Sequence, residues 1–160
     1  MDELIGVYRK GRPNLENVDL LQILISDNGY RVRANIMADA KVKQGTAATY
    51  AYFFTWKSPV REGKLKSFHT LDIPFAFNNV DEASSMTGAG QERYALADRM
   101  STAFANFARG GDPNHSGLPR WPAFDSEKRP TMVFDDACEV VNDPHRTERL
   151  ALDAVRKAAS

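Results

Sequence analysis

The stretch from Ala47 to Trp56 constrains the fold more than any other part of the chain. Its sequence, AATYAYFFTW, is rich in aromatic and β-branched residues and predicts a β-strand. Apolar side chains would point to both faces of this strand, as in a strand inside a sheet that is covered on both sides. Such a strand needs neighbours, and the rest of the chain offers few. We therefore expect an α/β architecture that is rich in helices and has few strands. Either it is not an ordinary sheet domain, or the sheet is incomplete in this chain and part of it lies outside.

Helices dominate the remainder of the sequence. Apolar residues spaced by three and four predict helices over residues 1–10, 15–25, 30–43, 91–108 and 145–158. Asn14 is the expected cap of the second helix, and the polar run 26–29 is expected to separate it from the third. Residues 131–134 and 138–141 are weaker strand candidates. The chain opens inside a helix with no preceding cap or strand, which is unusual for a complete domain.

Composition and charge exclude several classes of protein. The 160 residues suffice for one domain, and 21 basic side chains balance 21 acidic ones, so nothing favours nucleic acid or an anionic membrane surface. Cys138 is the only cysteine, which excludes an internal disulfide and a cysteine-based zinc site. No apolar run approaches the roughly 20 residues that span a bilayer, and the N-terminus does not resemble a signal peptide. We expect a cytoplasmic location.

The segment SFHTLDIPFAFNN, residues 67–79, carries the candidate chemistry. His69 lies between large apolar side chains, so it is either a buried structural histidine or a proton-transfer residue. The three histidines of the chain are scattered, so we expect no metal, and no cofactor motif is present. No G-x-S-x-G motif occurs, which leaves His69 without a visible nucleophile. The residues alone therefore favour the structural interpretation.

Segment 67–79 also resembles the histidine segment of the type-B carboxylesterases, the family of para-nitrobenzyl esterases and cholinesterases. In that family a catalytic histidine is followed three residues later by an acid, and then by an apolar-Pro-Phe-x-Phe run. The residues His69, Asp72, Pro74, Phe75 and Phe77 match this pattern in register.

Three further segments resemble the same family in the same order along the chain. ILISDNGYRVRA is similar to its D-x-x-[FY]-x-x-P motif at Asp27 and Tyr30, although Arg33 stands where the family often has proline. QGTAATYAYFFTWKSP resembles its Q-G-x-x-x-Y-x-Y-x-F-x-x-x-S strand. FANFARGGDPN followed by WPAF resembles its W-x-x-F-A-x-x-G-x-P-N and W-P-x-Y motifs, with Ala105 at a variable position.

The resemblance implies an α/β-hydrolase fold of which residues 1–160 are the C-terminal part. It implies that His69 is the general base of a serine carboxylesterase acting on small-molecule esters. The serine nucleophile and the glutamate of the triad would then precede this chain in the complete enzyme. The chain alone would be inactive, would bind the N-terminal portion of the same fold, and could self-associate through its exposed apolar surface.

Other residues receive roles from the same resemblance. Asp72 would support the histidine by bonding backbone or a neighbouring segment. Asp27 would be a buried, hydrogen-bonded acid near the histidine loop, or only a residue at a helix end. We expect Tyr50, Tyr52, Phe53, Phe54, Phe75 and Phe77 to pack in the core.

Two other interpretations remain open. Some relatives of the cholinesterases keep the fold, lose catalysis and act in adhesion, so the chain could belong to a non-catalytic interaction module. An unrelated helical α/β domain with a structural histidine is the other alternative, which the ordered matches disfavour.

Overall fold

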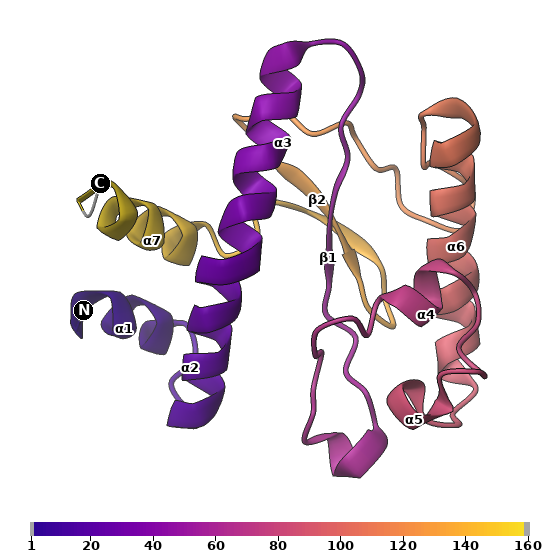
Figure 1. Ribbon diagram of the computed structural model, residues 1–160, viewed down its shortest axis with the longest axis horizontal. Helices are drawn as coiled ribbons and strands as arrows, with labels where there is room; N and C mark the ends of the chain where they lie inside the picture. Colours follow the sequence, from indigo (N-terminus) through magenta and orange to yellow (C-terminus); the bar gives the residue numbers. More distant parts are fainter. Residues whose placement is uncertain (1, 159–160) are drawn as a thin grey trace.

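The computed structural model describes residues 2–158 and shows helices arranged around a small sheet (Figure 1). Met1, Ala159 and Ser160, which belong to the expected unit 1–160, lie outside the described residues. Along the chain the elements are α1 (Asp2–Lys10), α2 (Asn17–Ser26), η1 (Asp27–Arg31), α3 (Val32–Gln44), β1 (Ala51–Phe54), η2 (Val60–Gly63), α4 (Ile73–Ala76), α5 (Ser84–Thr87), α6 (Glu92–Gly110), β2 (Pro130–Phe134), β3 (Glu139–Asn142) and α7 (Arg146–Ala158).

The second and third helices are not separated, so the expected break at residues 26–29 is wrong. A π-helical turn, η1, joins α2 to α3, and the backbone stays in the right-handed helical region at both of its ends. The polar residues do not end the helix because the Asp27 side chain is buried and bonded within the protein, as described below. The other end of α3 is as expected, since Gly45 stops it in the left-handed conformation at φ 66°.

The expected cap of α2 is also wrong. The helix begins at Asn17, preceded by Glu16, and no side chain caps it. Asn14 instead lies in a turn that is closed by a 3.2 Å hydrogen bond from the Leu15 amide to the Arg12 carbonyl. The helix therefore starts later than the apolar pattern indicates.

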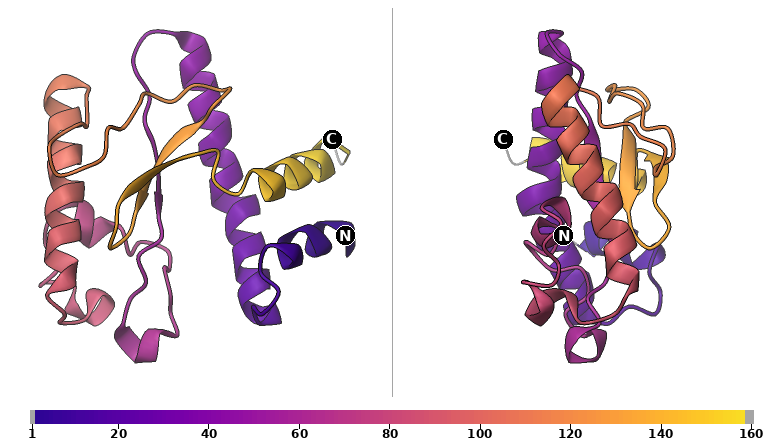
Figure 2. Two further views of the ribbon diagram at one scale, coloured as in Figure 1. Left: turned by 180° about the vertical axis from the view of Figure 1, so that it is seen from behind. Right: turned by 90° about the vertical axis from the view of Figure 1, so that its right-hand side faces the viewer.

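The three strands are ordered β1-β2-β3, and the helices α3 and α6 stand on either side of them (Figures 1 and 2). β1 pairs in parallel with β2, from Ala51 opposite Thr131 to Phe54 opposite Phe134. β2 pairs antiparallel with β3. Within residues 2–158 the other edge of β1 pairs with no strand. β1 spans only Ala51–Phe54, shorter than expected, because it is paired along one edge alone.

Buried hydrophobic residues form two separate clusters. The sheet core packs β2 and the turns after β1 against α4 and α6, and includes Leu71, Phe75, Leu96, Met100 and Phe134. The helical core joins α1, α2, α3 and α7 through the side chains of Leu4, Tyr8, Leu20, Val32 and Leu152. α1 and α7 lie side by side in both orientations of the molecule (Figures 1 and 2).

Several aromatic residues that were expected in the core are not buried. Tyr52 is 40% exposed and Phe77 is 76% exposed, so the prediction is wrong for these two. Tyr50, Phe53 and Phe54 are half-buried, because β1 lies at the edge of the described sheet. Phe75 is fully buried in the sheet core, as expected.

Candidate active site

His69 lies in the loop between β1 and α4 and is exposed. The residues on either side hold it there, because Phe68 packs against the sheet core and Leu71 is fully buried within it. Two successive turns shape the backbone. The Leu71 amide donates to the Phe68 carbonyl at 3.1 Å, and the Ile73 amide donates to the Thr70 carbonyl at 3.2 Å. The loop therefore presents the imidazole outward from a firmly anchored backbone.

The residue after the histidine has an unusual backbone conformation. Thr70 has a positive φ of 72°, in the left-handed region that a β-branched side chain rarely adopts. Such a conformation persists only where the surrounding contacts impose it, and it is enriched at functional sites. The adjacent turns and the burial of Leu71 supply those contacts.

Two side-chain hydrogen bonds tie the histidine loop to β1. The Ser67 hydroxyl donates to the Phe54 carbonyl at 3.1 Å, and the Tyr52 hydroxyl donates to Asp72 Oδ2 at 2.9 Å. Burial and then the charge and hydrogen bond of Asp72 raise the pKa of Tyr52, so the phenol stays protonated and remains a donor. Asp72 thus bonds a neighbouring segment, and no hydrogen bond joins it to His69. Its supporting role stays a prediction.

The imidazole of His69 has an aromatic partner. The ring of Tyr30, in the π turn η1, stacks on it with 5.0 Å between ring centroids and 29° between ring planes. Among residues 2–158 no side chain or backbone group is hydrogen-bonded to either ring nitrogen of His69, so both remain available. Sequence reasoning included Tyr30 in the D-x-x-[FY] pattern but assigned it no role.

Asp27 lies on the same π turn and is buried, with 6% of its surface exposed. It accepts hydrogen bonds from the Tyr8 hydroxyl at 2.7 Å and from Arg31 Nε at 2.7 Å. Burial and the bond to Asp27 raise the pKa of Tyr8. Burial lowers the pKa of Arg31, but the bond to Asp27 and its charge outweigh burial and raise it overall. Asp27 is therefore buried and hydrogen-bonded, but its bonds are not to His69, and its supporting role at the site stays a prediction.

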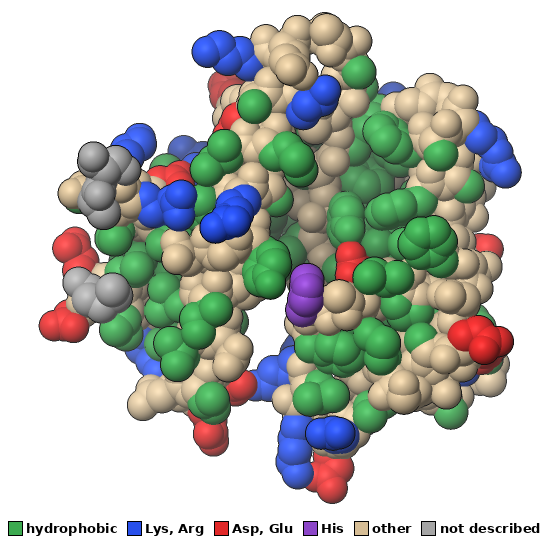
Figure 3. Space-filling model, in the orientation of Figure 1, with side chains coloured by type: hydrophobic (Ala, Val, Ile, Leu, Met, Phe, Trp, Pro, Cys, Tyr) green, Lys and Arg blue, Asp and Glu red, His purple; other side chains and the backbone are tan. Residues whose placement is uncertain are grey.

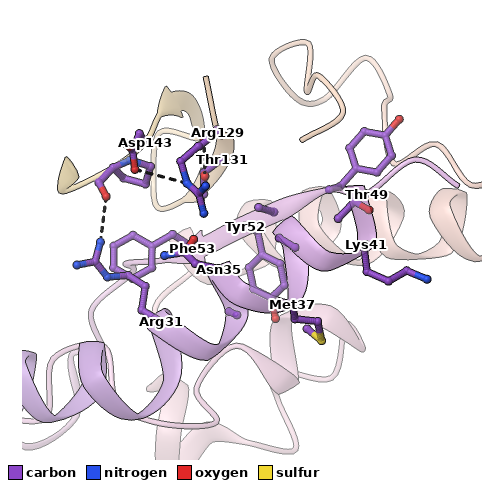
Figure 4. Close-up of a pocket in the computed structure, with 15 residues that line it drawn as sticks. Arg31, Asn35, Met37, Lys41, Thr49, Tyr52, Phe53, Arg129, Thr131 and Asp143 are labelled. Carbon is purple, nitrogen blue, oxygen red and sulfur yellow. Dashed lines mark hydrogen bonds and ion pairs between the residues drawn. The ribbon is translucent and has the colours of Figure 1, made fainter. Parts of the chain in front are cut away.

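A cavity of about 420 Å³ separates α3 from β1 (Figure 4). Met37 and Lys41 line it from α3, and Tyr52 and Phe53 line it from β1. Arg129, Thr131 and Asp143 contribute polar groups at another wall. His69 does not line the cavity, but Tyr52, which bonds Asp72 of the histidine loop, does. The cavity therefore lies along the unpaired edge of β1 and between the two cores.

Other chemistry finds little support in residues 2–158. These residues contain no group of three or more His, Cys, Asp or Glu side chains that could hold a metal ion. Cys138 packs at the edge of the sheet core and donates to the Asp135 carbonyl at 3.5 Å. No helix in this part of the chain is both long and apolar enough to cross a membrane.

Comparison with known proteins places this arrangement in a family. The profile of the Carboxylesterase family matches residues 2–152. The para-nitrobenzyl esterase of Bacillus subtilis (strain 168) is 31% identical over 118 residues, which cover 72% of this chain and 24% of the relative. The phenmedipham hydrolase of Pseudarthrobacter oxydans is 30% identical over 134 residues, which cover 81% of this chain and 26% of the relative. The chain thus spans about a quarter of the length of these curated relatives.

Solved structures agree with the sequence comparison. A carboxylesterase of Geobacillus stearothermophilus superposes with a TM-score of 0.81 at 33% identity, over 95% of this chain and 32% of that one. A thermophilic para-nitrobenzyl esterase superposes with a TM-score of 0.73 at 27% identity. These neighbours confirm the expected α/β-hydrolase fold, of which this chain holds a helix-rich portion with three strands. The chain belongs to the carboxylesterase family.

Proposed function

We propose that this chain is the C-terminal part of a serine carboxylic-ester hydrolase and supplies its catalytic histidine, His69. The observation that carries the proposal is the anchored loop, which exposes an imidazole with both nitrogens free of hydrogen bonds, in a chain of the carboxylesterase family. The nucleophilic serine and the triad acid would come from outside these 160 residues, which contain no G-x-S-x-G motif.

The proposed chemistry is acyl transfer to water. The His69 imidazole would take the serine proton as the hydroxyl attacks the ester carbonyl, and would then protonate the alcohol as the C–O bond breaks. In the second half, His69 would take a proton from water, which attacks the acyl-enzyme, and return it to the serine. An acid partner on the other ring nitrogen would fix the tautomer, and Asp72 is already engaged by Tyr52.

The surface around the histidine loop suits docking of the rest of such a fold. Hydrophobic side chains gather over β1, α4 and α6 beside a hollow (Figure 3). Five of the exposed large hydrophobic side chains on or next to these elements form a surface that we call the apolar face, namely Tyr52, Ile73, Phe77, Phe104 and Phe107. The unpaired edge of β1 offers free backbone donors and acceptors, so a further parallel strand of the sheet could pair there. Such an apolar surface with an open strand edge is typical of an interface.

A chimera tests the catalytic role. Residues 2–152 of this chain would replace the matching segment of the Bacillus subtilis para-nitrobenzyl esterase, and hydrolysis of p-nitrophenyl acetate would be measured. We expect His69→Ala to lower kcat by at least about a thousandfold, because loss of a triad member leaves only binding and the oxyanion hole. His115→Ala is the matched control, since that imidazole bonds the Arg99 carbonyl elsewhere. A folded chimera that keeps its full rate with His69→Ala would contradict the catalytic role of His69, whereas a folded chimera without turnover would favour a non-catalytic interaction module.

The isolated chain provides a second test. With neither nucleophile nor oxyanion hole in these residues, the 160-residue chain should hydrolyse p-nitrophenyl acetate no faster than the buffer does. Turnover by the chain alone that His69→Ala abolishes would contradict the proposed division of the active site.

A further inference from the structure

The histidine loop and the π turn meet through a pair of rings. Tyr30 comes from η1 and His69 from the loop after β1, and their rings stack at 5.0 Å and 29°. An ion pair between Lys66 and Asp19 joins the same loop to α2 nearby. The stacked pair therefore links the helical part of the chain to the loop that carries the imidazole.

The π turn explains why the Tyr30 ring lies there. Asp27 and Arg31 bond each other within the turn, Asp27 also bonds Tyr8, and Arg31 Nη1 donates to the Pro144 carbonyl at 2.9 Å. These bonds fix the turn on its buried side. Tyr30 lies between the bonded residues in sequence but is 59% exposed, which is where the histidine loop passes. π turns inside helices are frequent at functional sites.

Stacking engages the imidazole in a way that suits proton transfer. The hydrogen-bonding lone pair and N–H of an imidazole lie in the ring plane, whereas Tyr30 contacts the ring face. The contact therefore restricts rotation of the side chain without occupying either nitrogen. A hydrogen bond to the Tyr30 hydroxyl would instead compete with the serine or the acid.

We infer that Tyr30 is a positioning residue for His69, whose ring plane it sets through the stacked pair. This inference rests on the proposed function for its kinetic consequence, while the contact itself can be tested on the chain alone. An aromatic pair contributes an amount equivalent to about a twofold to tenfold change in a rate or equilibrium constant.

The first test is NMR of the full 160-residue chain. The His69 ring protons, assigned by their loss in His69→Gln, should be shifted upfield by the Tyr30 ring current. Tyr30→Ala should move these signals downfield, and Tyr30→Phe, which keeps the ring, should leave them nearly unchanged. Phe77→Ala is the matched control, because this exposed aromatic follows the same loop without a ring contact to His69. Unchanged His69 signals in Tyr30→Ala would overturn the inference.

The second test measures kinetics in the chimera described above. Tyr30→Ala should lower kcat by about twofold to tenfold with KM unchanged, and Tyr30→Phe should restore the rate. A full rate in Tyr30→Ala would overturn the positioning role. If His69→Ala left the rate unchanged while the NMR shifts behaved as expected, the proposed function would fail and the contact would stand. The two failures are therefore distinguishable.

Discussion

Asp27 is the residue whose removal should most weaken the helical part of the chain. Its carboxylate is buried and accepts hydrogen bonds from the fully buried Tyr8 hydroxyl and from Arg31. Asp27→Ala removes the carboxylate that accepts from the buried Tyr8 hydroxyl, which costs about 1–3 kcal/mol. It also leaves a guanidinium that is mostly buried without its counterion.

The size of the expected loss of stability depends on the hydrogen bonds that each partner of Asp27 keeps after the substitution. Arg31 keeps its bond to the Pro144 carbonyl. Loss of its counterion should therefore destabilise the fold by less than the roughly 3–5 kcal/mol that breaking a buried ion pair outright costs. We expect Asp27→Ala to lower the free energy of unfolding by about 3 kcal/mol. Asp27→Asn keeps a carbonyl oxygen that can accept from Tyr8, so its cost should be about half as large.

Urea denaturation at a fixed protein concentration measures both changes. With a slope of about 2 kcal/mol/M, Asp27→Ala should lower the midpoint by about 1.5 M. Asp19→Ala is the matched control on the same helical stretch, because it removes only a surface ion pair to Lys66 and should cost less than about 1 kcal/mol. Equal midpoint shifts in Asp27→Ala and Asp19→Ala would refute the claim that the buried network holds the π turn.

Four further results are expected. Tyr52→Phe should lower stability by about 1 kcal/mol in urea denaturation, since it removes the hydrogen bond to Asp72. Leu96→Ala should cost about 2–5 kcal/mol, because this side chain is fully buried in the sheet core. Burial raises the pKa of Asp143, but the bond and charge of Arg149 with the neighbouring arginines outweigh it and hold the pKa below its ordinary 3.8. The unfolded chain therefore binds this proton first, so thermal stability should fall as pH drops below about 4, and less steeply in Asp143→Asn. Sedimentation should show self-association through the apolar face, and a clean monomer with a sharp melting transition would count against docking there.

Much of the fold follows from local pattern. The α6 stripe of apolar residues, the glycine that stops α3, and the β1 strand are all visible in the sequence because helical spacing, left-handed turns and β-branched content each leave a mark. The π turn η1, in contrast, cannot be recognised from the local sequence pattern. Asp-Asn-Gly is a turn signal in isolation, and the helix continues through it only because Tyr8 and Arg31 bond Asp27. That contact joins residues 19 positions apart and cannot be inferred from spacing.

The candidate site, like the fold, could be predicted only in part from the sequence. The segment that carries His69 and Asp72 could be found from its motif, but the partner of Asp72 could not, because Tyr52 was expected in the core. The near-continuous run of apolar and aromatic residues in β1 indicated burial on both faces. Among residues 2–158 no strand pairs with the other edge of β1, and Tyr52 is partly exposed and bonds the loop. The apolar pattern of a strand predicts how buried it would be in a complete sheet. It does not show which neighbouring strands are present.

His69 is connected to both halves of the molecule. Its loop is bonded to β1 at Phe54 and Tyr52, next to the sheet core, while its ring stacks on Tyr30, next to the helical core. The cavity between α3 and β1 separates those same two cores. In the proposed enzyme, the helical part of the chain would therefore set the ring plane of His69 through Tyr30, while the sheet would fix its loop through Phe54 and Tyr52.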